Sequence, residues 1–303
     1  MKPERRLELA RLLSRLERIG PGELLPEIPN SRPIGNAFRI GITGPMGAGK
    51  STLINLLAGK IRDNNFPLGI IAVDPSSPFT GGAVLGDRIR MADHALDEDI
   101  FIRSLATKGA FGGLAEGAME ATDLYDMFGF NRIIIETVGV GQTEVDIMEA
   151  CDATVVVLEP SSGDGVQAIK AGLMEIADLF VVNKMDIKGA AHFVADVEMA
   201  TMLKDHDNPI KVIPVQATSG DGIEDLYQYL ENYFIEKKQN GFLETRRAGQ
   251  KSKRIKRLAE SIVSRRIWDH LPQEEIERIS LGEMPVREAA QLIVDKFISL
   301  KVL

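Results

Sequence analysis

The sequence predicts an α/β fold, in which a mainly parallel sheet is covered by helices on both faces. Six short apolar segments, rich in isoleucine and valine, alternate with longer stretches of helical character. Most lack period-two alternation, which is typical of strands buried on both faces. The 303 residues are 44% hydrophobic, enough to bury a full core without disulfides. Strands are expected within 38–43, 69–74, 132–137, 153–158, 179–183 and 211–216.

Composition and charge exclude several classes of function. The formal net charge of −8 gives no support to nucleic-acid binding. The single cysteine, Cys151, rules out an internal disulfide and fits a cytoplasmic setting. No apolar run approaches the ~20 residues that span a bilayer. The charged N-terminus has no secretory apolar region. We therefore expect a cytoplasmic protein that binds neither nucleic acid nor membrane.

The chain divides into three regions. In residues 4–19 leucines recur at helical spacing, and the proline-rich stretch 21–36 then indicates a linker or an extended arm. After the last expected strand only helical patterns follow, one continuing to His270 and one beginning at Pro285. The expected parts are an N-terminal helix and linker (1–38), a core α/β domain (39–240) and a helical C-terminal region (241–303).

The strongest motif is the glycine-rich segment 44–52, GPMGAGKST, between the first expected strand and an apolar helical stretch. It matches G-x-x-x-x-G-K-[ST], the phosphate-binding loop of P-loop NTPases. Its glycines let backbone N–H groups point at phosphate oxygens, and the helix N-terminus adds positive dipole. Lys50 supplies charge for the β- and γ-phosphates, and Ser51 a hydroxyl for Mg²⁺. The residues predicted to hold the nucleotide are Gly44, Gly47, Ala48, Gly49, Lys50, Ser51 and Thr52.

A second motif, NKMD at residues 183–186, closes the fifth expected strand. In an N-K-x-D tetrad the aspartate accepts hydrogen bonds from the ring N–H and exocyclic amine of guanine, and the asparagine amide meets the other edge. Adenine presents an acceptor where guanine presents the ring N–H, so the carboxylate rejects ATP. Open parallel sheets bind ligands at such strand ends, and together the motifs predict a GTPase. The predicted base contacts are Asn183, Lys184 and Asp186, with Gln216, Ala217 and Thr218 on the far side.

A P-loop enzyme also needs acidic residues near the Mg²⁺ that accompanies its nucleotide. Three candidates lie at strand ends or in the loops after them: Asp74, Asp87 and Glu136. For each, a role in a helix cap or turn is the alternative. Glu136 begins E-x-x-G, in which the Gly139 N–H could sense the γ-phosphate. With the loop hydroxyl, the predicted metal ligands are Ser51, Asp74, Asp87 and Glu136.

Five segments of the chain resemble the MeaB/ArgK family of G proteins. The resemblance implies a GTPase of the signal-recognition-particle/MinD (SIMIBI) class, homodimeric through its C-terminal arm. It implies a chaperone that gates adenosylcobalamin loading and protects or reactivates an acyl-CoA mutase. Adenosylcobalamin would enter only through that mutase, whereas Mg²⁺ with GTP or GDP would bind this chain. The segments are GPMGAGKST (44–52), VDPSSPFTGGAVLGDRIRM (73–91), ETVGVGQTEVDI (136–147), GDGVQAIKAGLMEIAD (163–178) and NKMD (183–186).

The resemblance also implies residue roles. Residues 163–178 resemble the family's third switch, with Gln167 and Lys170 responsive to the partner. From the residues alone this segment is an amphipathic helix after a Gly-Asp-Gly turn. Slow intrinsic hydrolysis that the mutase stimulates is expected. The set assigned to catalysis is Lys50, Asp87, Glu136, Gly139 and Lys170.

Two other functions stay open. A nickel-type metal-insertion GTPase needs thiolate or imidazole ligands that converge on the metal. Cys151 has no neighbouring histidine and is predicted to be a core residue. A P-loop small-molecule kinase usually takes ATP, and the N-K-x-D tetrad argues against a kinase because it favours guanine. The mutase itself is undetermined: methylmalonyl-CoA mutase is the commonest family partner, and isobutyryl-, 2-hydroxyisobutyryl- and ethylmalonyl-CoA mutases are alternatives.

The C-terminal region also leaves alternatives. It is either a helical cap on the core domain or a dimerisation arm. Residues 246–257 hold seven basic residues and no acidic one. Such a run is typical of a solvated helix face, but it could instead dock an acidic partner or lie near the nucleotide site of a dimer.

Overall fold

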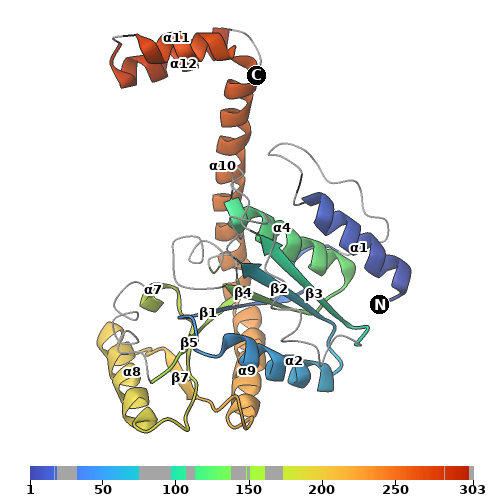
Figure 1. The fold of residues 1–303 in the computed structure, drawn as a ribbon. Helices are drawn as coiled ribbons and strands as arrows, with labels where there is room; N and C mark the ends of the chain where they lie inside the picture. Colours follow the sequence, from blue (N-terminus) through green and yellow to red (C-terminus); the bar gives the residue numbers. More distant parts are fainter. Residues whose placement is uncertain are drawn as a thin grey trace.

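The computed structural model describes residues 1–16, 18, 33–74, 97–106, 113–137, 148, 151–160, 173–282 and 284–299. Its centre is a seven-stranded sheet in the order β3-β2-β4-β1-β5-β6-β7, with every neighbouring pair parallel (Figure 1). The predicted α/β class is therefore confirmed. The strands are β1 Phe38–Thr43, β2 Leu68–Asp74, β3 Ile100–Ala106, β4 Arg132–Thr137, β5 Ala153–Leu158, β6 Leu179–Val182 and β7 Lys211–Pro214.

All six predicted strands are present, and β3 is the strand that was not predicted. It lies at the edge of the sheet and pairs with β2. Its sequence, IFIRSLA, carries Arg103 and Ser104 inside the apolar run, and both side chains are partly exposed. An edge strand has fewer neighbours than a central one, so polar residues are tolerated there and weaken the pattern.

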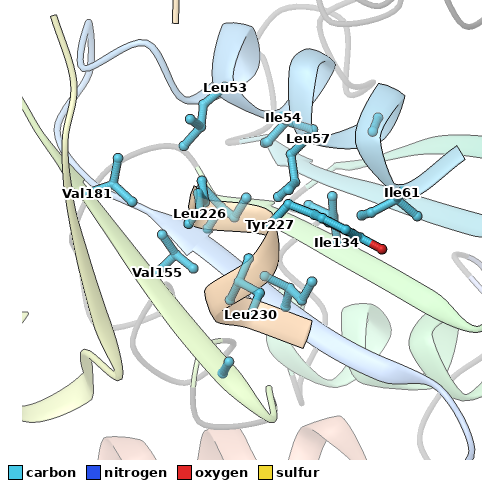
Figure 2. Packing of buried hydrophobic residues seen from close by; sticks show 14 of the residues in the cluster. Leu53, Ile54, Leu57, Ile61, Ile134, Val155, Val181, Leu226, Tyr227 and Leu230 are labelled. Carbon is cyan, nitrogen blue, oxygen red and sulfur yellow. The ribbon is translucent and has the colours of Figure 1, made fainter. Parts of the chain in front are cut away.

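Helices cover both faces of the sheet. The described helices are α1 Pro3–Leu16, α2 Lys50–Asp63, α4 Gly113–Phe128, α7 Met174–Ile176, α8 Ala190–Lys204, α9 Ile223–Gln239, α10 Phe242–His270, α11 Gln273–Leu281 and α12 Val286–Ser299. Helices α2 and α9 share one buried cluster, in which Leu57 and Leu230 pack with Val155 of the sheet (Figure 2). On the opposite face α1 and α4 pack over β2 and β4, and α8 packs over β5 and β6.

The N-terminal helix follows its predicted pattern. Helix α1 buries its leucine face, Leu9, Leu12, Leu13 and Leu16, in the same cluster as α4. Cys151 is fully buried in that cluster, and burial raises the pKa of its thiol to about 12. Its predicted role as a small core residue is confirmed. Ile19 and most of the proline-rich stretch lie outside the described residues.

Helix α10 leaves the sheet and carries α11 and α12 at its far end (Figure 1). At 1.5 Å per residue its 29 residues span about 43 Å. The expected helices to His270 and from Pro285 are present as α10 and α12, whereas α11 between them was not predicted. The C-terminal region is thus a protruding helical arm.

The solvated-face interpretation of the basic run is wrong at three positions. Arg246 binds Asp178 through two hydrogen bonds of 2.8 and 2.9 Å. Arg247 binds Asp152 at 2.7 and 2.6 Å, and Arg254 pairs with Asp123. Asp178 and Asp152 each precede a strand, so α10 is anchored at the edge of the sheet where the parallel strands begin. These three arginines therefore form ion pairs with aspartates of the same chain and fix α10 to the core domain.

Candidate nucleotide site

The glycine-rich loop joins the carboxyl end of β1 to the start of α2. Gly44 and Gly49 have φ angles of 142° and 87°, a region that L residues rarely adopt. A Cβ on Gly44 would lie 2.1 Å from the Val157 carbonyl oxygen, and one on Gly49 would lie 2.3 Å from Asn183 Nδ2. Glycine is therefore required at both positions by the backbone and by the packing around it.

Lys50 is the first residue of α2, and its side chain folds back into the loop. Its Nζ donates hydrogen bonds to the carbonyl oxygens of Gly44 at 2.8 Å and Pro45 at 2.9 Å. Burial lowers the pKa of this ammonium, and the charge of Glu136 opposes that shift. A polyphosphate in this loop would offer the ammonium charged oxygens in place of neutral carbonyls.

The hydroxyl and carboxylate predicted to bind Mg²⁺ are in direct contact. Ser51 Oγ donates a hydrogen bond to Glu136 Oε1 at 2.8 Å, and Glu136 is only 4% exposed. In the sheet, Glu136 lies beside Ile42 of β1 and Ala72 of β2. Asp74 ends β2 at the same edge, and its side chain lies outside the described part. This oxygen-only donor set at the phosphate loop fits Mg²⁺.

Asn183 connects the two loops that the sequence assigned to the phosphate and the base. Its Nδ2 donates to the Ala48 carbonyl oxygen at 2.8 Å, and its Oδ1 accepts from the Ala217 N–H at 3.0 Å. The residue is 2% exposed. Sequence reasoning assigned this amide to guanine and missed its bracing role. The contact with guanine stays a prediction.

The remaining base residues lie on the same edge of the sheet. Lys184 has a φ angle of 62°, and Asp186 presents an exposed carboxylate two residues later. The Met185 N–H donates to the Val215 carbonyl oxygen at 3.3 Å, which ties the tetrad to the end of β7. The structure therefore brings the tetrad beside the segment Gln216 to Thr218. In this segment Gln216 is half-buried, Ala217 is buried and Thr218 is exposed.

Sequence reasoning missed one charged residue at this site. Glu159 directly follows β5, is 8% exposed and pairs through Oε2 with Lys184 Nζ. Its other oxygen, Oε1, lies 3.7 Å from the point where a Cβ on Gly47 would stand. The available signal was an acidic residue that closes an apolar strand, the same signal that identified Glu136.

Several predicted residues lie outside the described part of the chain. They are Asp87, Gly139, Gln167 and Lys170. Within the described part, no group of three or more His, Cys, Asp or Glu residues is arranged to hold a metal ion. None of the described helices is long and apolar enough to cross a membrane.

A parallel sheet with a phosphate loop after β1 and an N-K-x-D tetrad after β6 defines the protein as a P-loop GTPase. The family model described as methylmalonyl-CoA mutase-associated GTPase MeaB matches residues 10–271. The chain belongs to this MeaB family, which confirms the resemblance found in the sequence.

Known proteins agree with this assignment. A protein of Pyrococcus abyssi that is named as a GTPase is 41% identical over 274 residues, covering 87% of this chain and 84% of the relative. The methylmalonic aciduria type A homolog of Mus musculus, named as mitochondrial, is 36% identical over 253 residues, covering 81% of this chain and 60% of the relative. The crystal structure of a LAO/AO transport system kinase matches with a TM-score of 0.66 and 24% identity, covering 98% of this chain and 88% of that one. That structural likeness shows the shared fold.

Proposed function

We propose that this GTPase binds GTP with Mg²⁺ at the carboxyl edge of its sheet and serves as a chaperone of an adenosylcobalamin-dependent acyl-CoA mutase. Membership of the MeaB family carries the mutase part of the proposal. The Asn183 brace supports the guanine-nucleotide part, because it holds a phosphate loop and a base tetrad at one edge. Adenosylcobalamin would be bound by the mutase, and this chain would gate its loading.

Catalysis in this site would consist of positioning and charge neutralisation, with little covalent chemistry from the protein. Lys50 would bind the β- and γ-phosphates, and the loop N–H groups would surround them. Ser51 and Glu136 would hold Mg²⁺, which would neutralise developing phosphate charge, with Asp74 and Asp87 completing the acidic set. Asp186 would select guanine. Gly139 and Lys170 would respond to the γ-phosphate and to the mutase.

The C-terminal arm supports homodimerisation. A groove of about 560 Å³ lies between α10 and α12 and is lined mainly by apolar residues. Trp268 and Val294 in this groove are 48% and 38% exposed. Burying such apolar surface against a second copy would stabilise a dimer by about 25 cal/mol per Å². The arm projects from the sheet, so a second copy can reach it (Figure 1).

The test is the rate of GTP hydrolysis by the purified protein, alone and with methylmalonyl-CoA mutase from the same organism. A rise of tenfold, about 1.4 kcal/mol of barrier, is expected if the mutase completes the catalytic arrangement. The Lys50→Ala variant, measured with the same mutase, controls for contaminating GTPases. Equal rates with and without every one of the four candidate mutases would refute the chaperone role, while GTP turnover alone would still agree with the family.

Neither alternative function gains support from the structure. A nickel-insertion GTPase needs convergent soft ligands, and the described residues hold no such group. One structural neighbour is named as a kinase, but that likeness, at 24% identity, concerns the fold alone. The guanine tetrad, as placed beside the phosphate loop, favours GTP.

A further inference from the structure

Glu159 occupies a special place in the strand order. Strand β5 lies between β1, which leads into the phosphate loop, and β6, which leads into the base tetrad. The residue that follows β5 therefore stands between the two loops. Glu159 uses this position with both oxygens, since Oε2 pairs with Lys184 and Oε1 faces Gly47 of the phosphate loop.

The partner of Glu159 has an unusual backbone conformation. Lys184 has a φ angle of 62°, and among the described residues Asn65 is the other non-glycine with positive φ. Such a conformation costs on the order of 1 kcal/mol and persists where surrounding contacts impose it. Two contacts hold Lys184 in this conformation. The Ile187 N–H donates to the Lys184 carbonyl oxygen at 3.0 Å, and the Lys184 ammonium pairs with Glu159.

The electrostatics explain why both charges are needed. A carboxylate beside a phosphate loop repels phosphate, and at partial burial this repulsion is weakly screened. The side chains of Glu159 and Lys184 are 11% and 36% exposed, so each neutralises the other in a partly dry environment. Removing one partner of such a pair takes this neutralisation from the other, whereas removing both partners removes both charges.

We propose that Glu159 is a positioning residue of the nucleotide site, which holds Lys184 and so keeps the base tetrad in register with the phosphate loop. This inference rests on the proposed nucleotide site. The pair acts as a neutral bridge between the two loops. It sets nucleotide affinity and guanine preference, and it takes no part in bond cleavage.

The test is a double-mutant cycle with Glu159→Gln, Lys184→Met and the double variant. Titration with fluorescent GDP and GTP gives Kd, steady-state hydrolysis gives kcat, and competition by ADP gives base preference. For Glu159→Gln we expect about a tenfold rise in both Kd values, weaker discrimination against ADP, and a kcat within about twofold of the parent. For Lys184→Met we expect a larger loss of affinity, because the Glu159 charge then faces the phosphates without the Lys184 ammonium to neutralise it.

The double variant decides between a bridge and two independent residues. A bridge predicts that Glu159→Gln partly rescues Lys184→Met, so the double variant binds GDP at least about threefold more tightly than Lys184→Met alone. The inference would be overturned if the fold-losses of GDP affinity in the two single variants multiply to give that of the double variant. Unchanged Kd values for Glu159→Gln would overturn it as well. If Glu159→Gln does not fold, the same comparison uses Glu159→Asp, which keeps the charge but shortens its reach.

Two further variants separate this inference from its foundation. Glu236→Gln removes an exposed ion pair with Lys237 near the end of α9 and should leave all nucleotide constants unchanged. Lys50→Ala should abolish nucleotide binding. If Lys50→Ala still binds GDP, the nucleotide site itself is misassigned. If Lys50→Ala loses GDP binding but the Glu159 variants bind like the parent, the site stands and only the role proposed for Glu159 is refuted.

Discussion

Asn183 is the residue whose replacement tests the assembly of the site most directly. Its side chain is 2% exposed and makes one hydrogen bond to each neighbouring loop, at 2.8 Å to Ala48 and 3.0 Å to Ala217. Replacing it with alanine removes both ties and introduces no new group. The Ala48 carbonyl oxygen and the Ala217 N–H would then lose their partner.

The expected loss of unfolding free energy in Asn183→Ala follows from the two backbone groups that lose a hydrogen-bond partner. A buried donor or acceptor left without a hydrogen bond costs about 1–3 kcal/mol. Two such groups give a loss of about 2–5 kcal/mol in the free energy of unfolding, once partial relaxation is allowed. The loops would also lose their fixed separation, so we expect the Kd for GDP to rise by two orders of magnitude or more, about 3 kcal/mol.

Urea unfolding measures the first effect and fluorescent GDP titration the second. Asn183→Asp is the informative companion, because it keeps the acceptor for Ala217 but loses the donor to Ala48. It should therefore bind GDP weakly as well. An Asn183→Ala protein with the parental unfolding midpoint and parental Kd would refute the bracing role and show that the loops are held in place by other contacts.

Three further predictions concern other parts of the molecule. Asp186→Asn should change the preference from guanine to xanthine nucleotides without loss of stability, since Asp186 is exposed; unchanged selectivity in a competition assay would contradict the base assignment. Arg247→Met should lower the free energy of unfolding by about 3 kcal/mol, because Asp152 is fully buried, and the double variant with Asp152→Asn should recover part of it; a urea-unfolding loss below about 1 kcal/mol would argue against the anchor. If the proposed dimer forms through the groove, Trp268→Glu should convert a dimeric parent to monomers in sedimentation while GTP binding persists; an unchanged sedimentation profile would contradict the proposed dimer contact.

Local pattern was sufficient wherever a residue's role depends on its neighbours in the chain. The phosphate loop is recognisable because glycines, Lys50 and Ser51 must follow one strand and open one helix. The central strands are recognisable because burial on both faces requires continuous apolar runs. Strand β3 was not predicted because an edge strand does not need a continuous apolar run, and Arg103 and Ser104 interrupt its apolar pattern.

Roles that depend on distant residues were not predicted. The basic run has the same sequence whether water or carboxylates surround it. The start of α10 contacts Asp152 and Asp178 because it lies at the edge of the sheet where β5 and β6 begin. Glu159 carries no motif of its own. It became recognisable once the order β1-β5-β6 placed it between two loops.

The sequence by itself determined the fold class, the phosphate loop, the base tetrad and membership of the MeaB family, because each of these is written in residues close together in the chain. The tertiary structure decided that Asn183 braces the two loops, that Glu159 pairs with Lys184, and that the arm is anchored through half-buried arginines. The physical reason is the arrangement of the parallel strands, whose neighbours in space are separated by long stretches of chain. It brings the carboxyl ends of β1, β4, β5 and β6 to one edge, where the site lies, and the starts of β5 and β6 to the other edge, where α10 is anchored.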